Sequence, residues 1–184
     1  MEKNPLIQKI NKLLCDDLIE ISRFGKSEIL LVWIPASAIQ KVAKTLREDA
    51  DLQLDWLENL SVVDLDEVFV LSYFVRSTST PYHLVLRVSQ IPEASRKSEP
   101  NQILYIPSSK ETWPMSEPME NEIEEMFGIH FEKEMKNKPV QVLRNRLLPS
   151  GWKGFPLRKD FQFPDQVLGV QHHRDQTDSS QTLL

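Results

Sequence analysis

VFVLSYFV (68–75) and YHLVLRVS (82–89) are two apolar stretches joined by the polar hexapeptide RSTSTP (76–81). β-Branched and aromatic residues dominate both stretches, and this composition is typical of strands. The residues between them are small, polar or proline, as expected of a connecting loop. The sequence therefore predicts an antiparallel hairpin over residues 68–89, around which the other strands can be arranged.

Two further strands are predicted before this hairpin, LIEISRF (18–24) and EILLVWI (28–34), with Gly25 and Lys26 between them. The second is apolar on both faces around Trp33, which is typical of an interior strand. After the hairpin, ILYIP (103–107) predicts a short strand that follows a surface loop.

Two helices are predicted to pack on this sheet. One begins at Asn4-Pro5 and the other at Pro35-Ser37, because cap and first-turn residues there precede apolar residues at helical spacing. These apolar stripes consist of Leu6, Ile10, Leu13 and Leu14 in the first helix, and Ile39, Val42, Ala43 and Leu46 in the second. Residues 1–106 are therefore expected to form an α+β domain with a mixed or antiparallel sheet.

The character of the chain changes after residue 106. PSSKETWPMSEPMENE (107–122) contains three prolines and no periodicity, and a short amphipathic helix is predicted to follow and to end at Gly128. One face of that helix carries Met119, Ile123, Met126 and Phe127. We interpret residues 107–165 as an extension, more in keeping with wrapping a partner than with folding back, and 166–184 as a disordered polar tail.

Composition excludes several classes of function. A net charge of −5 without a basic run argues against a nucleic-acid partner, and no apolar stretch approaches the roughly 20 residues of a membrane span. The N-terminus does not resemble a signal peptide, so a cytosolic protein is expected. Cys15 is the single cysteine, so no iron–sulfur cluster is predicted. The four histidines are His83, His130, His172 and His173. They lack the spacing of metal ligands, so no metal site is predicted either.

Catalysis by this chain is not favoured. The carboxylates at 120–125 could do acid–base chemistry only in a pocket that separates their pKa values, and acidic residues near a helix N-terminus more often interact with the helix dipole. No nucleotide-binding or hydrolase motif is present. The alternative is a small soluble enzyme that uses Glu120, Glu122 and Glu125 with His130.

An interaction surface is a better interpretation of the C-terminal region. Arg144, Arg146, Arg158 and Lys159 lie there, together with three aromatic residues, Trp152, Phe155 and Phe161. Arginine and aromatic residues are enriched at protein interfaces, and arginine tolerates interface burial better than lysine.

Three blocks of this region resemble the complex I thirty-kilodalton subunit family, whose bacterial members are the C subunits of NADH:quinone oxidoreductases. They are IPSSKETWPMSEPMENE (106–122), IEEMFGIHF (123–131) and LRNRLLPSGWKGFPLRKDF (143–161), in the same order as in the family. The last block ends in the family's P-L-R-K-D-F. Phe155 stands where the family has histidine, and Glu132–Lys138 replaces a family G-H-P.

The resemblance implies a scaffold subunit with no catalytic, cofactor-binding or metal-binding residues of its own. It would dock the large hydrogenase-like subunit that helps to form the quinone site, beside other peripheral-arm subunits, on the cytoplasmic side of the membrane. The host complex would carry FMN and iron–sulfur clusters, use NADH and quinone, and pump protons. An energy-converting hydrogenase, or a complex without the NADH module, is the alternative host.

The resemblance also assigns residues to the partner interface. In the block 154–161 we expect Pro156, Leu157 and Phe161 to be apolar anchors, and Arg158, Lys159 and Asp160 to form ion pairs. The complete predicted interface comprises Trp113, Glu120, Glu122, Glu125, Phe127, Gly128, Arg144, Arg146, Gly154, Pro156, Leu157, Arg158, Lys159, Asp160 and Phe161.

Overall fold

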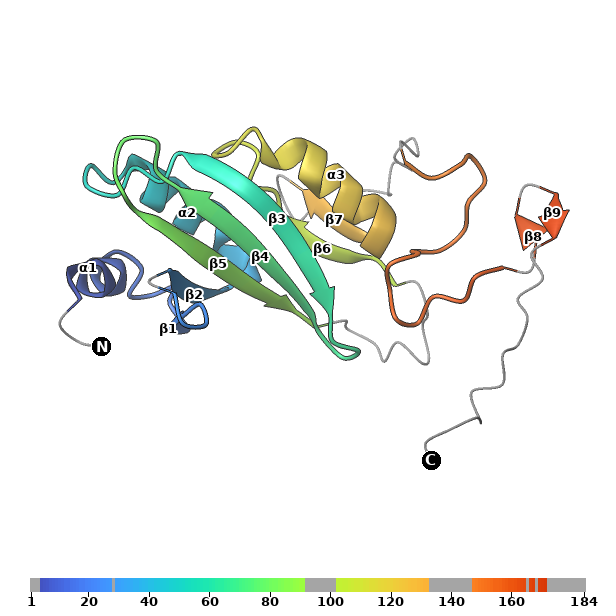
Figure 1. Cartoon of the computed structure of the whole chain (residues 1–184), viewed down its shortest axis with the longest axis horizontal. Helices are drawn as coiled ribbons and strands as arrows, with labels where there is room; N and C mark the ends of the chain where they lie inside the picture. Colours follow the sequence, from blue (N-terminus) through green and yellow to red (C-terminus); the bar gives the residue numbers. More distant parts are fainter. Residues whose placement is uncertain are drawn as a thin grey trace, which may run out of the picture.

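A five-stranded sheet forms the centre of the computed structural model, which describes residues 4–27, 29–91, 102–132, 147–164, 166–167 and 169–171. The strands lie in the order β1 (Glu20–Arg23), β2 (Leu30–Pro35), β5 (His83–Gln90), β4 (Phe69–Arg76) and β3 (Trp56–Asp64). Figure 1 shows the helices on one side of this sheet and the C-terminal segment extending from one end.

Strand pairing confirms the predicted hairpin. β4 and β5 are antiparallel and pair over their full length, from Phe69 opposite Gln90 to Arg76 opposite His83. β2 is parallel to β5, whereas the other pairs are antiparallel, so the sheet is mixed. β2 is an interior strand, as its apolar sequence predicts.

Both predicted N-terminal helices are present. α1 (Pro5–Leu13) is capped by Asn4, whose side-chain oxygen accepts a hydrogen bond of 2.9 Å from the Leu6 amide. α2 (Ile39–Glu48) follows a single 3₁₀ turn, η1 (Ala36–Ala38), and buries the predicted stripe. The stripe residues and the inward side chains of the sheet form one apolar cluster, so the α+β fold class is confirmed.

Strand β3 has no counterpart in the sequence prediction. It lies at the edge of the sheet, where one face is buried and the other is exposed, and a bulge between Leu57 and Asn59 interrupts its alternation. The apolar residues Trp56 and Val63 on the exposed side and the extra residue at the bulge hide the period of two that identifies a strand.

Residues 104–132 form a second unit, in which β6 (Leu104–Pro107) and β7 (Ile129–Glu132) pair in parallel around α3 (Ser116–Phe127). Trp113, Ile123 and Ile129 join the same apolar cluster as the sheet. Gly128 ends α3 with a φ of +65°, as predicted for this glycine. The expected boundary at residue 106 falls inside β6, and the chain that follows it contributes to the domain core.

The described residues after β7 have little regular structure. Residues 147–164 contain turns only, and β8 (Gln166–Val167) and β9 (Val170–Gln171) pair with each other in a small antiparallel ribbon. Residues 172–184 of the predicted tail, with His172 and His173, lie outside the described residues. Most of the stretch 132–138, which stands in place of the family's G-H-P, also lies outside the described residues.

Trp113 tests whether the chain beyond residue 107 belongs to the cooperative core. Its side chain is 1% exposed, and its indole nitrogen donates a hydrogen bond of 2.9 Å to the Leu54 carbonyl. Trp113→Phe should lower the free energy of unfolding by about 1–3 kcal/mol, since the carbonyl loses its buried donor. Urea unfolding of the whole chain measures this effect.

The control is Trp56→Phe, because Trp56 is an exposed tryptophan on β3. Its substitution should change the free energy of unfolding by less than about 0.5 kcal/mol. Equal unfolding free energies for the two variants would mean that residues around 113 unfold independently of the sheet.

Candidate interaction surface

Arg158 is the residue that fastens the C-terminal segment to the domain. Its side chain is largely buried and donates from Nε to the Phe127 carbonyl at 2.5 Å, and from one terminal nitrogen to the carbonyls of Gln102 at 2.5 Å and Gly128 at 3.3 Å. Two of these carbonyls lie at the C-terminal end of α3, where carbonyl groups lack helical partners and a cation is favoured. One guanidinium thus joins the start of β6, the end of α3 and the C-terminal segment.

Aromatic rings enclose the same guanidinium. Its central carbon lies 4.5 Å from the ring centre of Phe155 and 5.3 Å from that of Phe69. Phe155 also packs against Gly128 so closely that a Cβ atom at position 128 would lie 2.4 Å from the ring. Glycine is therefore favoured at 128 both by the left-handed backbone and by the close approach of Phe155.

Residues on either side of Arg158 add two more attachments. The Leu157 amide donates to the Met126 carbonyl at 3.2 Å, and the Lys159 amide donates to the Asp64 carboxylate at 2.9 Å. The Lys159 ammonium forms an exposed ion pair of 3.0 Å with Asp66. The attachment therefore depends mainly on buried backbone and guanidinium hydrogen bonds, because exposed ion pairs contribute little.

Glu125 holds the beginning of the same segment. Its carboxylate accepts hydrogen bonds from the amides of Leu147, at 3.0 Å, and Leu148, at 2.6 Å. Glu125 lies on α3, so this helix contacts the segment near residue 147 and again near residue 158. The residues between these two attachments form a loop whose ends are fixed.

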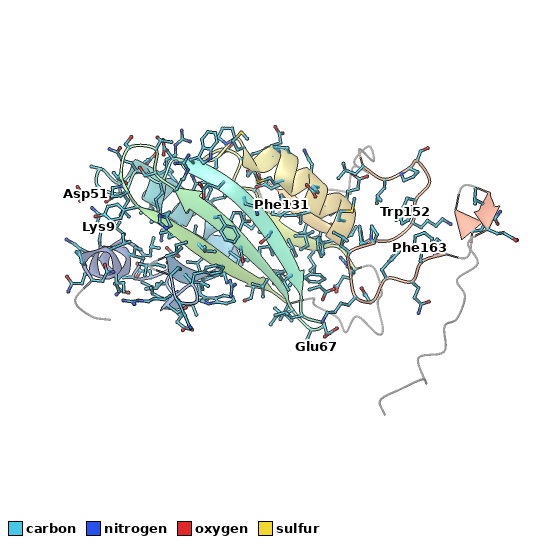
Figure 2. The ribbon with its side chains drawn as sticks, viewed as in Figure 1. Lys9, Asp51, Glu67, Phe131, Trp152 and Phe163 are labelled. Atoms are coloured by element: carbon cyan, nitrogen blue, oxygen red, sulfur yellow. The ribbon has the colours of Figure 1, made fainter. Side chains whose placement is uncertain are left out.

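An aromatic cluster lies within the segment. Trp152 stacks on Phe161 with ring centres 6.0 Å apart, and Phe163 meets both rings edge-on. Figure 2 shows Trp152 and Phe163 beyond the end of α3, outside the body formed by the sheet and helices. The Trp152 indole N–H is shielded from solvent and has no hydrogen-bond partner among the described residues.

A groove of about 220 Å³ runs between α3 and the edge strand β3. Its walls include Met119, Glu122 and Met126 from the helix, and Leu157 from the C-terminal segment closes one side. Leu157 remains 55% exposed. Three predicted interface residues, Glu122, Phe127 and Leu157, therefore line one hollow.

Glu120 turns into the domain. It is 4% exposed and accepts hydrogen bonds from the Ser108 hydroxyl at 2.6 Å and from the Ser109 amide and hydroxyl at 2.8 and 2.9 Å. These bonds fix the chain between β6 and α3. Burial, and in second place the charge of Glu120, raises the pKa of the Tyr73 phenol well above its usual range, so this phenol remains neutral.

The carboxylates of the alternative enzyme are not gathered in one place. Glu122 lines the groove, Glu120 points at the serines, and Glu125 binds backbone amides. His130 lies instead beside Glu124, with 3.2 Å between its Nδ1 and the Glu124 Oε1. Among the described residues, no three metal-ligating side chains come together as a metal site would require.

The model of the family described as "Respiratory-chain NADH dehydrogenase, 30 Kd subunit" matches residues 32–167 of this chain. The chain belongs to this family. A relative from Roseiflexus castenholzii, named as the C subunit of NADH-quinone oxidoreductase, is 31% identical over 176 residues, which are 94% of this chain and 91% of the relative. A protein of the same name from Chloroherpeton thalassium is 30% identical, over 73% of this chain and 50% of the relative.

The thirty-kilodalton fold also occurs in a chain of the membrane-bound sulfane sulfur reductase, an archaeal respiratory membrane complex. The two structures superpose with a TM-score of 0.61 at 18% identity, over 88% of this chain and 86% of that chain. No helix in the described part of the chain is both long and apolar enough to cross a membrane.

Most of the residues that the family resemblance assigns to the interface lie along α3 and the segment 147–164. Arg144 and Arg146 lie outside the described residues. Sequence reasoning missed Asp64 and the carbonyl of Gln102, which hold the segment in place. Asp64 follows two valines in the sequence VVD. Its role could not be predicted from its neighbours, because its partner, the Lys159 amide, is almost a hundred residues away.

Glu120→Gln should destabilise the protein. The Glu120 carboxylate accepts three hydrogen bonds, whereas a glutamine amide would turn its NH₂ group toward one of the three donors. We therefore expect a loss of about 1–3 kcal/mol in the free energy of unfolding. The matched control is Glu122→Gln, on the same helix and exposed, with an expected change below about 0.5 kcal/mol. Similar values for both variants in urea unfolding would contradict an internal role for Glu120.

Arg158→Ala should release the C-terminal segment without unfolding the sheet. Losing the charged hydrogen bonds to three carbonyls should speed chymotrypsin cleavage after Trp152 or Phe161 about tenfold or more. Lys159→Ala is the control, and its cleavage rate should change little because its ion pair is exposed. Equal cleavage of the two variants would show that Arg158 does not hold the segment.

Proposed function

We propose that this chain is a non-catalytic scaffold subunit in the peripheral arm of a proton-pumping NADH:quinone oxidoreductase, where it docks the large quinone-site subunit. One observation carries the proposal above all. The family's signature block ends in a segment that is pinned to the domain by Arg158 and yet presents apolar side chains outward.

The geometry of the segment suits an interface. Its two attachments on α3, at Glu125 and at Arg158, restrict the loop before any partner binds, and such preorganisation lowers the entropy lost on association. Between and beyond these attachments lie Trp152, Phe161 and Phe163, the kinds of residue that dominate binding energy at interface centres.

The predicted interface residues then have two roles. Trp113, Glu120, Gly128 and Arg158 shape and hold the surface from inside, because their side chains or backbone pack within this chain. The outward residues Glu122, Leu157 and Phe161 contact the partner, and we add Trp152 and Phe163 to this group. Gly154, Pro156, Lys159 and Asp160 lie in the same loop.

The redox chemistry belongs to other subunits in this proposal. FMN, the iron–sulfur clusters, NADH and quinone are bound elsewhere in the host complex, and this chain reaches the cytoplasmic face of the membrane only through its partners. The relatives named for NADH-quinone oxidoreductase support this host. The fold does not separate it from a hydrogenase-type or related complex, because a sulfane sulfur reductase contains the same fold.

Trp152→Ala tests the docking surface. In the purified pair with the large subunit, the variant should bind about 30-fold more weakly, as expected for a hot-spot residue. Ile19→Ala is the control, since this exposed side chain immediately precedes β1, at the far end of the domain, and its removal should leave the affinity unchanged. Isothermal titration calorimetry measures both affinities.

Protease protection provides a second measurement on the same pair. Binding should protect residues 147–164 from chymotrypsin while cleavage elsewhere continues at its former rate. Equal cleavage of this segment with and without the large subunit would refute the docking role. NADH-dependent quinone reduction by the native assembly distinguishes the proposed host from a hydrogenase-type complex.

A further inference from the structure

The outer face of the central sheet is a separate apolar surface. The register of the strands places on it the side chains that alternate with those of the main core. Figure 1 shows the helices on the other side of the sheet, and none of the described helices covers this face. Its central residues are Leu31, Trp33, Val70, Phe74, Val85 and Arg87.

Some apolar side chains on this face are buried and others are exposed. Phe24 reaches over from the turn after β1 and meets Phe74 edge-on, with ring centres 6.1 Å apart. Leu31 and Val85 are buried but are not part of the main apolar cluster. Val63 and Phe24 remain 50% and 37% exposed, so apolar surface is left facing outward.

Arg87 lies in the middle of this apolar face. Its guanidinium carbon is 5.5 Å from the ring centre of Trp33, on the neighbouring strand, and Ser72 lies opposite it on the other neighbour. The Arg87 Nε–H is shielded from water and has no hydrogen-bond partner among the described residues. A shielded donor without an acceptor is costly, and Arg87 as a whole is only half-buried, so the described chain leaves the charge of an accessible guanidinium without a counter-charge.

The other charges on the face do not neutralise Arg87. Arg76 is paired with Glu58 at 2.7 Å, at one end of the face. Glu20 lies across Trp33 from Arg87, two strands away, and forms no ion pair with it in the described structure. Arg87 is therefore a cation beside an aromatic ring, with Trp33 and Val85 on one side and Ser72 and Ser89 on the other, and no carboxylate lies within ion-pair distance of it among the described residues.

We propose that this face binds a second protein subunit, whose surface presents an aspartate or glutamate side chain to Arg87 from within an apolar patch. The proposal assumes that the chain works in an assembly, and so rests on the proposed function. It concerns a surface that the segment 147–164 does not share. A carboxylate would satisfy the guanidinium by charge-assisted hydrogen bonds, while the surrounding apolar residues exclude water.

A second copy of this chain does not meet that requirement. A two-fold interface centred on this face would bring two Arg87 guanidinium groups together, and like charges repel there. The net charge of −5 also argues against an anionic membrane or nucleic acid at this position. A carboxylate from a different protein is the occupant that agrees with the charge and polarity of the face.

Crosslinking in the native assembly tests this proposal. Benzoylphenylalanine replaces Ser89, two residues from Arg87 on the same face of β5, and in parallel samples replaces Leu157 or Glu48. We expect position 89 to crosslink to another subunit, at a peptide that contains an acidic residue. Position 48, on the helix-covered side, is a control for nonspecific capture.

Position 157 separates the two proposals. Intersubunit crosslinks at 157 without any at 89 would overturn the sheet-face proposal and support the docking segment. Intersubunit crosslinks at 89 without any at 157 would support the sheet-face proposal and contradict the docking segment. Crosslinks from 89 to this chain itself, or to a second copy, would also overturn the sheet-face proposal.

Charge reversal provides the matching functional test. Arg87→Glu should lower the assembled fraction about tenfold, and changing the crosslinked acidic residue of the partner to arginine should restore it. Glu20→Gln is the matched control and should assemble normally. Equal loss with Glu20→Gln, or no rescue by the partner's reversed charge, would show that Arg87 acts within its own chain. Arg87→Gln, together with unfolding measurements, separates assembly from folding.

Discussion

The buried guanidinium of Arg158 is the contact on which the arrangement of the C-terminal half depends. It donates hydrogen bonds to the Phe127 carbonyl, at the end of α3, and to the Gln102 carbonyl, just before β6. The last carbonyls of a helix have no partner within the helix, so they need such a donor. Because an arginine cannot lose its charge in a protein, this contact cannot be relieved by deprotonation. The segment that carries it is thereby fixed to the domain without a core of its own.

The same contact explains why this region has the composition of an interface while part of it is buried in its own chain. Arg158 and Phe155 pack inward, against Gly128 and Phe69, so the chain between them must turn at Pro156 and Leu157. Leu157 is left on the outside, at the edge of the groove along α3. Because Phe155 and Arg158 turn inward, Leu157 between them must turn outward.

The sequence predicted the elements whose side chains alternate or repeat clearly. The hairpin over 68–89 and the helices α1 and α2 follow from apolar periodicity, which depends on neighbours in the chain. β3 was missed because a bulge, and apolar residues on its exposed face, interrupt its alternation of apolar and polar residues. The parallel pairing of β6 with β7 was missed because it depends on Ile129 being buried by residues distant in sequence.

The site shows a similar division. The motif resemblance identified the residues along α3 and 154–161, but residue type could not tell which of them point inward. Arg158 and Lys159 are adjacent cations, yet one is buried among carbonyls and the other is in an exposed ion pair. Arg87 shows the converse, since an arginine inside a strand of apolar residues gave no signal until the strand register placed it on the open face. Strand register and helix ends therefore determine which charges can contact a partner.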